Sequence, residues 1–396
     1  MEVRIGDSIE CNPTVKLVKG NEYPLIDIDK ISVGRKLVTN KDTIVYEKQS
    51  GCKFQNGDTL MARITPCLEN GKMAMASIPD KGIGSTELFV FRGKKGITDN
   101  DFVYYFLKQS YIRNLAANSM TGASGRQRAD LKFIKKIKFD LPSLPIQQKI
   151  ASILSSYDCL IENNTRRIRL LEQMAENLYK EWFVRFRFPE HEKVEMVNGL
   201  PKGWKIKRIA DIGRIETGKT PPMSNRKLYG GDILFVKTPD MHDKMFISST
   251  SETLSEDGNN YQLTKLLPTN SIMVSCIGTA GIVSINAKPA HTNQQINSII
   301  LNNLKDLEWL YYVCRQMKSI IELFGATGAT MTNLSKGKFE KLKVVVPKAN
   351  IRESFHKRIR PYFKEIFTLD QQNTLLTRQR DLLLPRLMSG KLEVKS

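Results

Sequence analysis

The segment Gly213–Thr220 satisfies the spacing G-x-x-x-x-G-K-[ST], which is typical of loops that cradle nucleotide phosphates. Such a loop must open a helix whose first amide groups point at the phosphates. Here Pro221-Pro222 follow at once, and a proline pushes the residue before it toward an extended conformation. The pattern therefore does not indicate an ATP site.

Two other patterns of reactive residues are incomplete. Asp80, Asp130 and Lys132 loosely match the PD-(D/E)-x-K metal site of nucleases, but such triplets arise often by chance in a lysine-rich chain. Asn12–Val15 lacks the last two residues of the Asn/Asp-Pro-Pro-aromatic motif of amino-group methyltransferases. We therefore expect a non-catalytic chain with no catalytic residue, no metal site and no cofactor of its own.

Recognition chemistry is better supported, in a turn rich in small and polar residues. Thr121–Arg128 offers two guanidinium groups and an amide, which suit phosphate oxygens and base edges. The candidate DNA contacts in this turn are Ser124, Arg126, Gln127 and Arg128. Its counterpart Thr327–Asn333 keeps the glycine frame but offers Thr330, Thr332 and Asn333 instead. This pair of turns predicts two readers of different sequences built on one frame.

Further polar residues lie in the same two regions of the chain. These additional candidate DNA contacts are Arg63, Lys72, Lys219, Thr220, Asn293 and Gln294. Two interpretations of all these residues stay open, because polar loops that join a helix to a strand carry the same side chains as a solvated surface. The sequence alone does not choose between contact and solvation.

These turns belong to a sequence that occurs twice. Pro142 matches Pro347 at an offset of 205 residues, and the same offset aligns apolar positions over the following helical turns. The aligned pairs include Ile150 with Phe355, Tyr157 with Tyr362, Ile161 with Ile366 and Leu178 with Leu383. A period this long exceeds the roughly 50 residues of solenoid repeats. Each copy is therefore expected to be a whole domain followed by a helix.

Two long helices are predicted after the two prolines. Residues 146–184 contain neither Gly nor Pro, and their apolar positions step by three and four, as in a coiled-coil seam. At 1.5 Å per residue this helix would span about 57 Å. Residues 351–388 repeat the seam, with Pro361 and Pro385 predicting a kink and an early stop. Two similar seams favour antiparallel packing, with ordinary core helices as the alternative.

The region before each long helix has the pattern of a mixed domain. Short apolar runs bounded by turn residues predict strands near 23–28, 59–62, 72–74 and 88–91, and one helix over 101–117. The second copy predicts strands at 232–237, 271–277 and 296–301, and one helix over 307–323. The expected fold class is α+β, with two mixed α/β domains in tandem repeat, separated by two long helices that form an antiparallel coiled coil.

Charge is the strongest compositional signal. The formal net charge is +20 and the isoelectric point is near 9.6, so the surface attracts polyanions and favours nucleic acid through counterion release. The alternative is a merely basic soluble protein. No apolar run reaches the roughly 18 residues of a membrane span, and the six cysteines are scattered as in a reducing compartment. We expect a cytoplasmic protein that binds no membrane.

With these features assembled, the chain resembles the specificity subunit of a type I restriction-modification system over nearly all of its 396 residues. The helix start with Leu141, Pro142, Gln147 and Ile150, and the ending Leu383–Leu392, carry the resemblance. Gly203-Trp204 with Thr217–Pro222 is similar to the entry of that family's recognition domains. The chain departs from the pattern at Asn350-Ile351-Arg352, where the first copy has Pro145-Ile146-Gln147.

The resemblance implies a non-catalytic DNA-binding subunit of a host defence system. Two target-recognition domains would each read one half of a bipartite site in double-stranded DNA, and the helices would space the halves. The helices would also dock two methyltransferase (M) subunits that use S-adenosylmethionine to methylate adenine N6. Restriction/translocase (R) subunits, with ATP and Mg²⁺, would complete the complex. The alternative is a stand-alone architectural DNA-binding protein without enzymatic partners.

These expectations divide the chain into five parts. Target-recognition domain 1 covers residues 1–142 and the central long helix covers 143–185, where we expect spacing and methyltransferase docking. A linker covers 186–203. Target-recognition domain 2 covers 204–346, and the C-terminal long helix, with the same two roles, covers 347–390.

Overall fold

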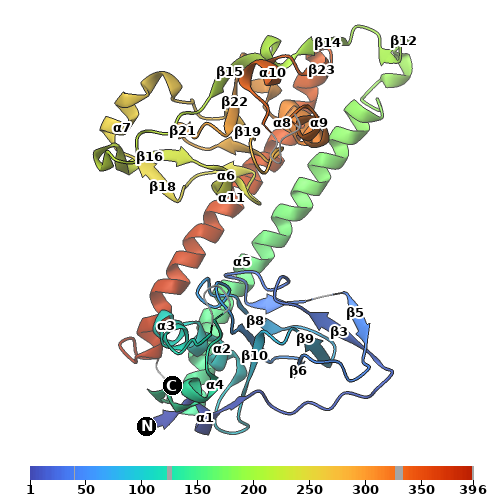
Figure 1. Cartoon of the computed structure of the whole chain (residues 1–396). Coiled ribbons are helices and arrows are strands. Elements are labelled where there is room, and N and C mark those ends of the chain that lie inside the picture. The colour runs from blue at the N-terminus through green and yellow to red at the C-terminus, as the bar shows by residue number, and fades with distance from the viewer. Residues whose placement is uncertain (40, 123–126, 326–332, 395–396) are drawn as a thin grey trace. The chain divides into compact units, whose positions relative to one another are not determined.

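The computed structural model describes residues 1–39, 41–122, 127–325 and 333–394 (Figure 1). The chain folds as two compact units, of which unit 1 comprises Met1–Arg166 with Leu369–Ser396 and unit 2 comprises Arg167–Thr368. Each long helix therefore contributes one part to each unit. Each unit combines one mixed α/β domain with pieces of both helices, so the expected α+β class with tandem domains is confirmed.

A five-stranded sheet with the order β2-β10-β7-β8-β4 forms the centre of unit 1. Its strands are β2 (Ile9–Cys11), β4 (Leu37–Val38), β7 (Thr59–Ala62), β8 (Met73–Ala76) and β10 (Leu88–Gly93). A second sheet has the order β5-β3-β9-β6, with β3 (Glu22–Ile26), β5 (Thr43–Val45), β6 (Cys52–Gln55) and β9 (Lys81–Gly84). All residues of β7 and β8 are buried, as expected for central strands covered on both faces.

The ends of the domain in unit 1 meet in a short strand pair. β1 (Glu2–Arg4) runs antiparallel to β11 (Lys138–Asp140), directly before the long helix. The short helices α1 (Ile5–Ser8) and α4 (Leu131–Lys136) pack against each other beside this pair. The start of the long helix is thereby tied to the N-terminal strand.

The helix expected over 101–117 is in fact two helices. α2 (Asn100–Lys108) packs on β7, β8 and β10, and α3 (Ser110–Asn118) follows it. Gln109 between them is extended, with φ −59° and ψ 138°, so the helical hydrogen bonding cannot continue. The helix expected over 307–323 also breaks, at Met317 between α8 (Leu307–Gln316) and α9 (Lys318–Gly325), but there the backbone turns with φ −84° and ψ 3° instead of extending. Apolar periodicity alone did not reveal these breaks.

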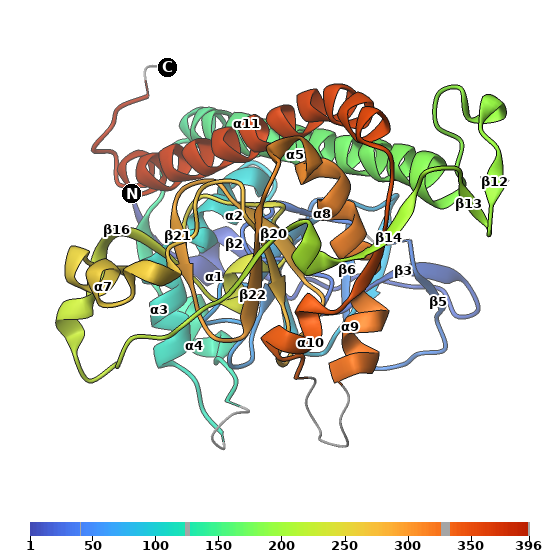
Figure 2. The same cartoon turned by 90° about the horizontal axis from the view of Figure 1, so that it is seen from above.

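Unit 2 repeats the central sheet with the order β15-β22-β19-β20-β17. Two of its strands, β20 and β22, are labelled in Figure 2. Its strands are β15 (Gly213–Thr217), β17 (Phe246–Ile247), β19 (Ile272–Ser275), β20 (Val283–Asn286) and β22 (Ile296–Leu301). The pair β14 (Lys205–Arg208) and β23 (Lys343–Val346) takes the place of β1 and β11. Because strand order and pairing agree, the sequence repeat is also a repeat of topology.

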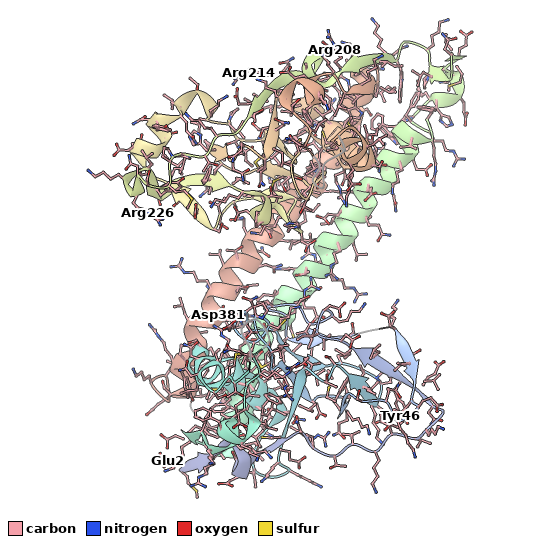
Figure 3. All side chains as sticks on the ribbon, in the orientation of Figure 1. Glu2, Tyr46, Arg208, Arg214, Arg226 and Asp381 are labelled. Carbon is pink, nitrogen blue, oxygen red and sulfur yellow. The ribbon has the colours of Figure 1, made fainter. Side chains whose placement is uncertain are left out.

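Unit 2 also repeats part of the second sheet of unit 1, in which β3 pairs antiparallel with β5 and parallel with β9. A three-stranded sheet has the order β18-β16-β21, with β16 (Tyr229–Val236), β18 (Glu252–Leu254) and β21 (Ala290–Thr292). The helices α6 (Thr238–Met241), α7 (Glu256–Tyr261) and α10 (Lys336–Glu340) and the hairpin β12 (Met196–Val197) to β13 (Leu200–Pro201) complete the unit. Arg208, Arg214 and Arg226 are exposed here, and their side chains reach outward in Figure 3.

The two long helices are close to their predicted lengths. α5 (Leu144–Tyr179) has 36 residues and continues into a π-helical turn, Lys180–Val184, and α11 (Ala349–Met388) has 40 residues. The early stop predicted at Pro385 is wrong, because α11 continues through it to Met388. Leu384 and Leu387 are buried in the core of unit 1 on either side of this proline. That packing holds the last turn helical despite the missing N–H.

The helices pack antiparallel wherever a unit contains both. In unit 1, Asn164 Nδ2 donates to Gln372 Oε1 at 3.3 Å, and Asp158 pairs with Arg380. In unit 2, Arg167 Nη2 donates to Glu365 Oε1 at 2.7 Å. Residue numbers that rise along α5 meet numbers that fall along α11, as in an antiparallel coiled coil.

The internal repeat aligns the ion pair of Asp158 and Arg380 with two apolar residues of unit 2. The offset of 205 residues places Phe363 at the position of Asp158 and Ala175 at the position of Arg380. In unit 1, Arg380 and Asp158 form a buried ion pair, and the Tyr105 hydroxyl also donates a hydrogen bond to Asp158. Unit 2 buries Phe363 and Ala175 in its apolar core instead. The matching positions of the repeat are thus occupied by an ion pair in unit 1 and by apolar side chains in unit 2.

Arg352, which stands where the first copy has Gln147, makes contacts within its own domain as Gln147 does. In unit 1, Gln147 is buried, its Nε2 donates to the Pro142 carbonyl at 2.8 Å, and its Oε1 accepts from Asp99 N–H at 3.0 Å. Arg352, at the matching position, donates from Nε to the Pro347 carbonyl at 3.2 Å and pairs with Asp306. Both side chains fasten the start of a long helix to its own domain.

Candidate nucleic-acid interface

In unit 1, two of the candidate arginines converge on one carboxylate. Arg128 donates to Glu87 from Nη2 at 2.6 Å and from Nε at 2.9 Å, in a bidentate arrangement. Arg63 Nε lies 3.9 Å from Glu87 Oε2, and the Arg63 guanidinium lies 5.2 Å from the centre of the Phe89 ring. These side chains are partly exposed, so the cluster is open to a ligand.

The backbone holds this cluster together. Arg63 N–H donates to the Glu87 carbonyl at 3.0 Å, and Ala129 N–H donates to the Arg63 carbonyl at 2.8 Å. Ile64 and Arg128 also form an antiparallel bridge, which closes the base of the 121–128 turn. Three segments that lie far apart in the sequence therefore meet at one corner, which we call corner 1 (Arg63, Glu87, Arg128 and Ala129).

Corner 1 carries a net positive charge. Hydrogen bonds from Arg128, together with the charges of Arg128 and Arg63, lower the pKa of Glu87 below its usual value. Glu87 is therefore ionised at neutral pH and offsets one of the two guanidinium charges. A bidentate carboxylate also fixes the plane of the Arg128 guanidinium, which favours directional hydrogen bonding to a base edge or phosphate.

Unit 2 builds the same corner from different side chains. Cys276 N–H donates to the Gln295 carbonyl at 2.8 Å, and Leu334 N–H donates to the Cys276 carbonyl at 3.0 Å. Ile277 and Asn333 form the matching bridge. Gln295 thus stands where Glu87 does and Asn333 stands where Arg128 does. We call this set corner 2 (Cys276, Gln295, Asn333 and Leu334), which is neutral and rich in amides.

Other candidates of the second copy surround corner 2. Thr220 Oγ1 donates to Gln294 Oε1 at 2.6 Å, and Asn293 Nδ2 donates to Gln295 Oε1 at 3.1 Å. Lys219 Nζ lies 4.6 Å from the centre of the Tyr261 ring, and its backbone N–H donates to the Thr292 carbonyl at 2.9 Å. Gly218 allows this approach, because a Cβ there would lie 2.2 Å from the Thr292 carbonyl oxygen.

The remaining candidates are placed differently. Gln127 lies at the base of corner 1, where its carbonyl accepts from Thr65 N–H at 3.0 Å. Lys72 instead donates to the Ile28 carbonyl at 3.1 Å and lines a separate cavity. Four candidates lie outside the described residues: Ser124, Arg126, Thr330 and Thr332.

The structure also bears on the patterns that suggested other chemistry. Gly213–Thr217 is a strand, and the next helical turn in the described chain begins only at Arg226, so no helix opens behind Thr220. Asp130 caps α4 by accepting from Lys132 N–H at 2.8 Å. Within the described ranges, no group of three or more His, Cys, Asp or Glu side chains is arranged to hold a metal ion. No described helix combines the length and apolarity that a membrane crossing requires.

Glu87 was not among the candidates found in the sequence, although a signal for it was present. Glu87 directly precedes β10 and Gln295 directly precedes β22, and these are matching strands of the two central sheets. An alignment of the two copies extended to these strands would have paired Glu87 with Gln295. Lone acidic residues before strands are common, so the residue type alone carried no signal.

Comparison with known proteins places this architecture in a family. A family model described as the type I restriction modification DNA specificity domain matches residues 2–173 and again 201–378. The two matches follow the internal repeat and cover most of the chain. The chain therefore belongs to the family of type I restriction-modification DNA specificity proteins.

Individual relatives agree with this family. The chain is 32% identical to the type I restriction enzyme HindI specificity subunit of Haemophilus influenzae, over 86% of this chain and 87% of that protein. It is 28% identical to the MjaIX specificity subunit of Methanocaldococcus jannaschii, over 76% of this chain and 71% of that protein. The fold is similar to the crystal structure of a type I S subunit from M. genitalium, with a TM-score of 0.58 and 14% identity over 98% and 96% of the two chains.

Proposed function

We propose that this chain is the DNA-recognition subunit of a type I restriction-modification complex and that each unit reads one half of a bipartite site in double-stranded DNA. Corner 1 and corner 2 supply the side chains that contact DNA at the base of the 121–128 and 327–333 turns. The net charge of +20 supplies the attraction to phosphates that does not depend on sequence.

The observation that carries this proposal is the pair of matching corners with different chemistry. The backbone bonds of Arg63, Glu87 and Ala129 recur at Cys276, Gln295 and Leu334, yet Arg128 is replaced by Asn333. Arginine pairs best with guanine and asparagine with adenine in the major groove. One scaffold with exchanged side chains is what two readers of unlike half-sites require.

Docking of two methyltransferase subunits is supported by exposed leucines on the long helices. Leu170 of α5 is 50% exposed and Leu375 of α11 is 58% exposed, and the two positions match at the offset of 205 residues. Two equivalent apolar positions suit two copies of one partner. Leu170→Glu and Leu375→Glu should each remove one methyltransferase subunit from the purified complex, whereas the matched surface control Gln173→Glu should remove none.

The chain itself contributes recognition and no catalysis in this proposal. S-adenosylmethionine would be bound by the methyltransferase subunits, and ATP and Mg²⁺ by the restriction/translocase subunits. This chain would supply neither reactive groups nor cofactor ligands. Its effect on the reaction is to choose the adenines that the partner methylates.

The experiment that tests this division of labour changes one corner at a time. We expect Arg128→Ala to relax one half of the methylated motif and Asn333→Ala to relax the other, at about 1 to 3 kcal/mol of discrimination for each lost bidentate contact. Genome-wide mapping of N6-methyladenine after co-expression with the methyltransferase subunit measures both halves. Equal weakening of both halves by either variant would contradict the assignment of one half to each unit.

A further inference from the structure

Unit 1 contains a cavity of about 430 Å³ that the recognition function does not use. It lies where the α2–α3 corner, the segment before β8 and the last turns of α11 come together, and all of its lining residues belong to unit 1. Its volume falls within the range of small-molecule sites, which is roughly 300 to 1,000 Å³.

The polar wall of this cavity is strongly basic. Its cationic residues are Lys72, Lys108, Arg113 and Arg380. The acidic residue that lines the cavity is Asp381, labelled in Figure 3, and it is bound to Arg380 at 2.9 Å. In the described part of the chain, neither Lys72, Lys108 nor Arg113 has a carboxylate within salt-bridge distance. Among the described residues, the wall therefore holds three cations that make no direct ion pair, with Asp381 as the acidic group beside them.

Two of these three cations make a specific contact at the cavity, and the third lies beside Gly71. Lys108 Nζ lies 3.4 Å from the Tyr104 hydroxyl and 5.4 Å from the centre of the Tyr104 ring. Lys72 Nζ donates to the Ile28 carbonyl at 3.1 Å. Arg113 Nη1 approaches Gly71 so closely that a Cβ there would lie 2.7 Å away, and Gly71 has a φ of +74°. The positive φ favours glycine at this position, whereas the Arg113 guanidinium is the end of a flexible side chain and could move aside.

Another part of the lining is apolar, and we call it the apolar wall. It is formed by Met61, Leu68, Met73, Leu107 and Leu384. A cavity with a cationic wall and an apolar wall is suited to a ligand that has both an anionic group and an apolar body. A phosphate dianion matches a cluster of guanidinium and ammonium groups better than a monovalent carboxylate does.

We propose that this cavity is a binding site for a small phosphorylated molecule with an apolar or aromatic body, the chemical class of the nucleoside monophosphates. Lys108 and Arg113 bind the phosphate, Lys72 adds to the positive field, and the methionine and leucine side chains contact the body. This site is separate from the proposed DNA contacts of corners 1 and 2 and does not depend on them.

The state of Lys108 makes the proposal sharply testable. Burial lowers the pKa of Lys108 to about 8, and the Arg380 charge acts in the same direction. Asp158, Asp381 and Lys36 are the other charged groups that act on it, the two acids opposing the shift and Lys36 adding to it. Bound phosphate favours the protonated ammonium, so binding should weaken as pH rises above about 8, by up to tenfold per pH unit.

The experiment is calorimetric titration of the full chain with inorganic phosphate at constant ionic strength, between pH 7 and pH 9.5. We expect saturable binding that weakens above pH 8, and at least a tenfold loss in Lys108→Met at pH 7. Lys95→Met, at an exposed lysine of the same unit, is the matched control and should bind as the unmodified chain does. Because methionine needs no solvation in this site, Lys108→Met should fold, and circular dichroism checks that it does.

Two further probes test the apolar wall. Adenosine monophosphate should bind more tightly than phosphate, and adenosine without the phosphate should bind far more weakly than either. The proposal is overturned if no probe binds, if Lys108→Met and Lys95→Met bind phosphate equally, or if affinity does not change between pH 7 and pH 9.5. Equal binding of adenosine monophosphate and phosphate would overturn the role of the apolar wall.

Discussion

Replacing Arg380 by alanine should destabilise unit 1 and leave unit 2 nearly unchanged. The Arg380 and Asp158 side chains are 2% and 5% exposed, so the variant strands a carboxylate in the interior. Removing one member of a buried ion pair costs about 3 to 5 kcal/mol. Asp158 keeps its hydrogen bond from Tyr105, which places the expected loss near the lower limit, at about 3 kcal/mol.

The chain itself suggests the compensating change. Asp158→Phe with Arg380→Ala installs the residues that unit 2 uses at the matching positions, Phe363 and Ala175. Replacing both members of a buried pair by well-packed apolar groups is often neutral or stabilising. The double variant should therefore recover most of the 3 kcal/mol that Arg380→Ala loses, whereas Asp158→Phe alone should be as damaging as Arg380→Ala.

The tryptophans separate the two units in a urea titration. Trp182, Trp204 and Trp309 all belong to unit 2, so their fluorescence follows that unit, while far-ultraviolet circular dichroism follows both. With a denaturant slope of about 2 kcal/mol per M, a loss of about 3 kcal/mol lowers the urea midpoint of unit 1 by about 1.5 M. A dichroism midpoint that does not move, or a double variant no better than Arg380→Ala, would refute this reasoning.

Three other changes test separate parts of the molecule. Glu87→Gln places the unit 2 residue in corner 1 and removes the negative charge beside both guanidinium groups. We therefore expect tighter non-specific DNA binding with a steeper salt dependence and a relaxed half-site, measured by fluorescence anisotropy on matched duplexes. Burial lowers the pKa of His291 to about 4 from the ordinary 6.5, so the free energy of unfolding of unit 2 has its full value above pH 6.5. It should fall by about 3 kcal/mol as the pH decreases toward 4. Tryptophan-detected urea titrations measure this loss, which His291→Gln should abolish. Inserting four residues after Asn163, matched by four after Asn373, adds about 6 Å of helix and should lengthen the unspecified spacer of the methylated motif while both half-sites stay the same; an unchanged spacer would exclude a ruler role for the helices.

Much of the architecture followed from the sequence because the repeat is aligned by residues that pack. The apolar seams of α5 and α11 predicted two long helices, and turn residues bounded the strands β7, β10 and β22 near their observed limits. The antiparallel direction was also expected from the seams. The helices and strands could be predicted because they depend on the spacing of apolar and turn residues that are close together in the sequence.

Features that depend on distant partners did not follow from the sequence. Glu87 is significant only because Arg63 and Arg128 reach it from other segments, and Arg380 only because the helix register brings it to Asp158. The break at Gln109 likewise reflects how α2 and α3 pack rather than a helix-breaking residue type. A residue type in one sequence does not reveal which partner the fold will bring to it.

The most direct test of the central claim is a map of N6-methyladenine in a host that expresses this chain with the methyltransferase subunit of its own system. We predict one bipartite motif with two unlike half-sites and a fixed spacer, present with the chain and lost without it. Methylation that persists unchanged without the chain would contradict its role as the subunit that selects the DNA site. A stable DNA complex with no dependence of methylation on the chain would favour the stand-alone architectural DNA-binding protein instead.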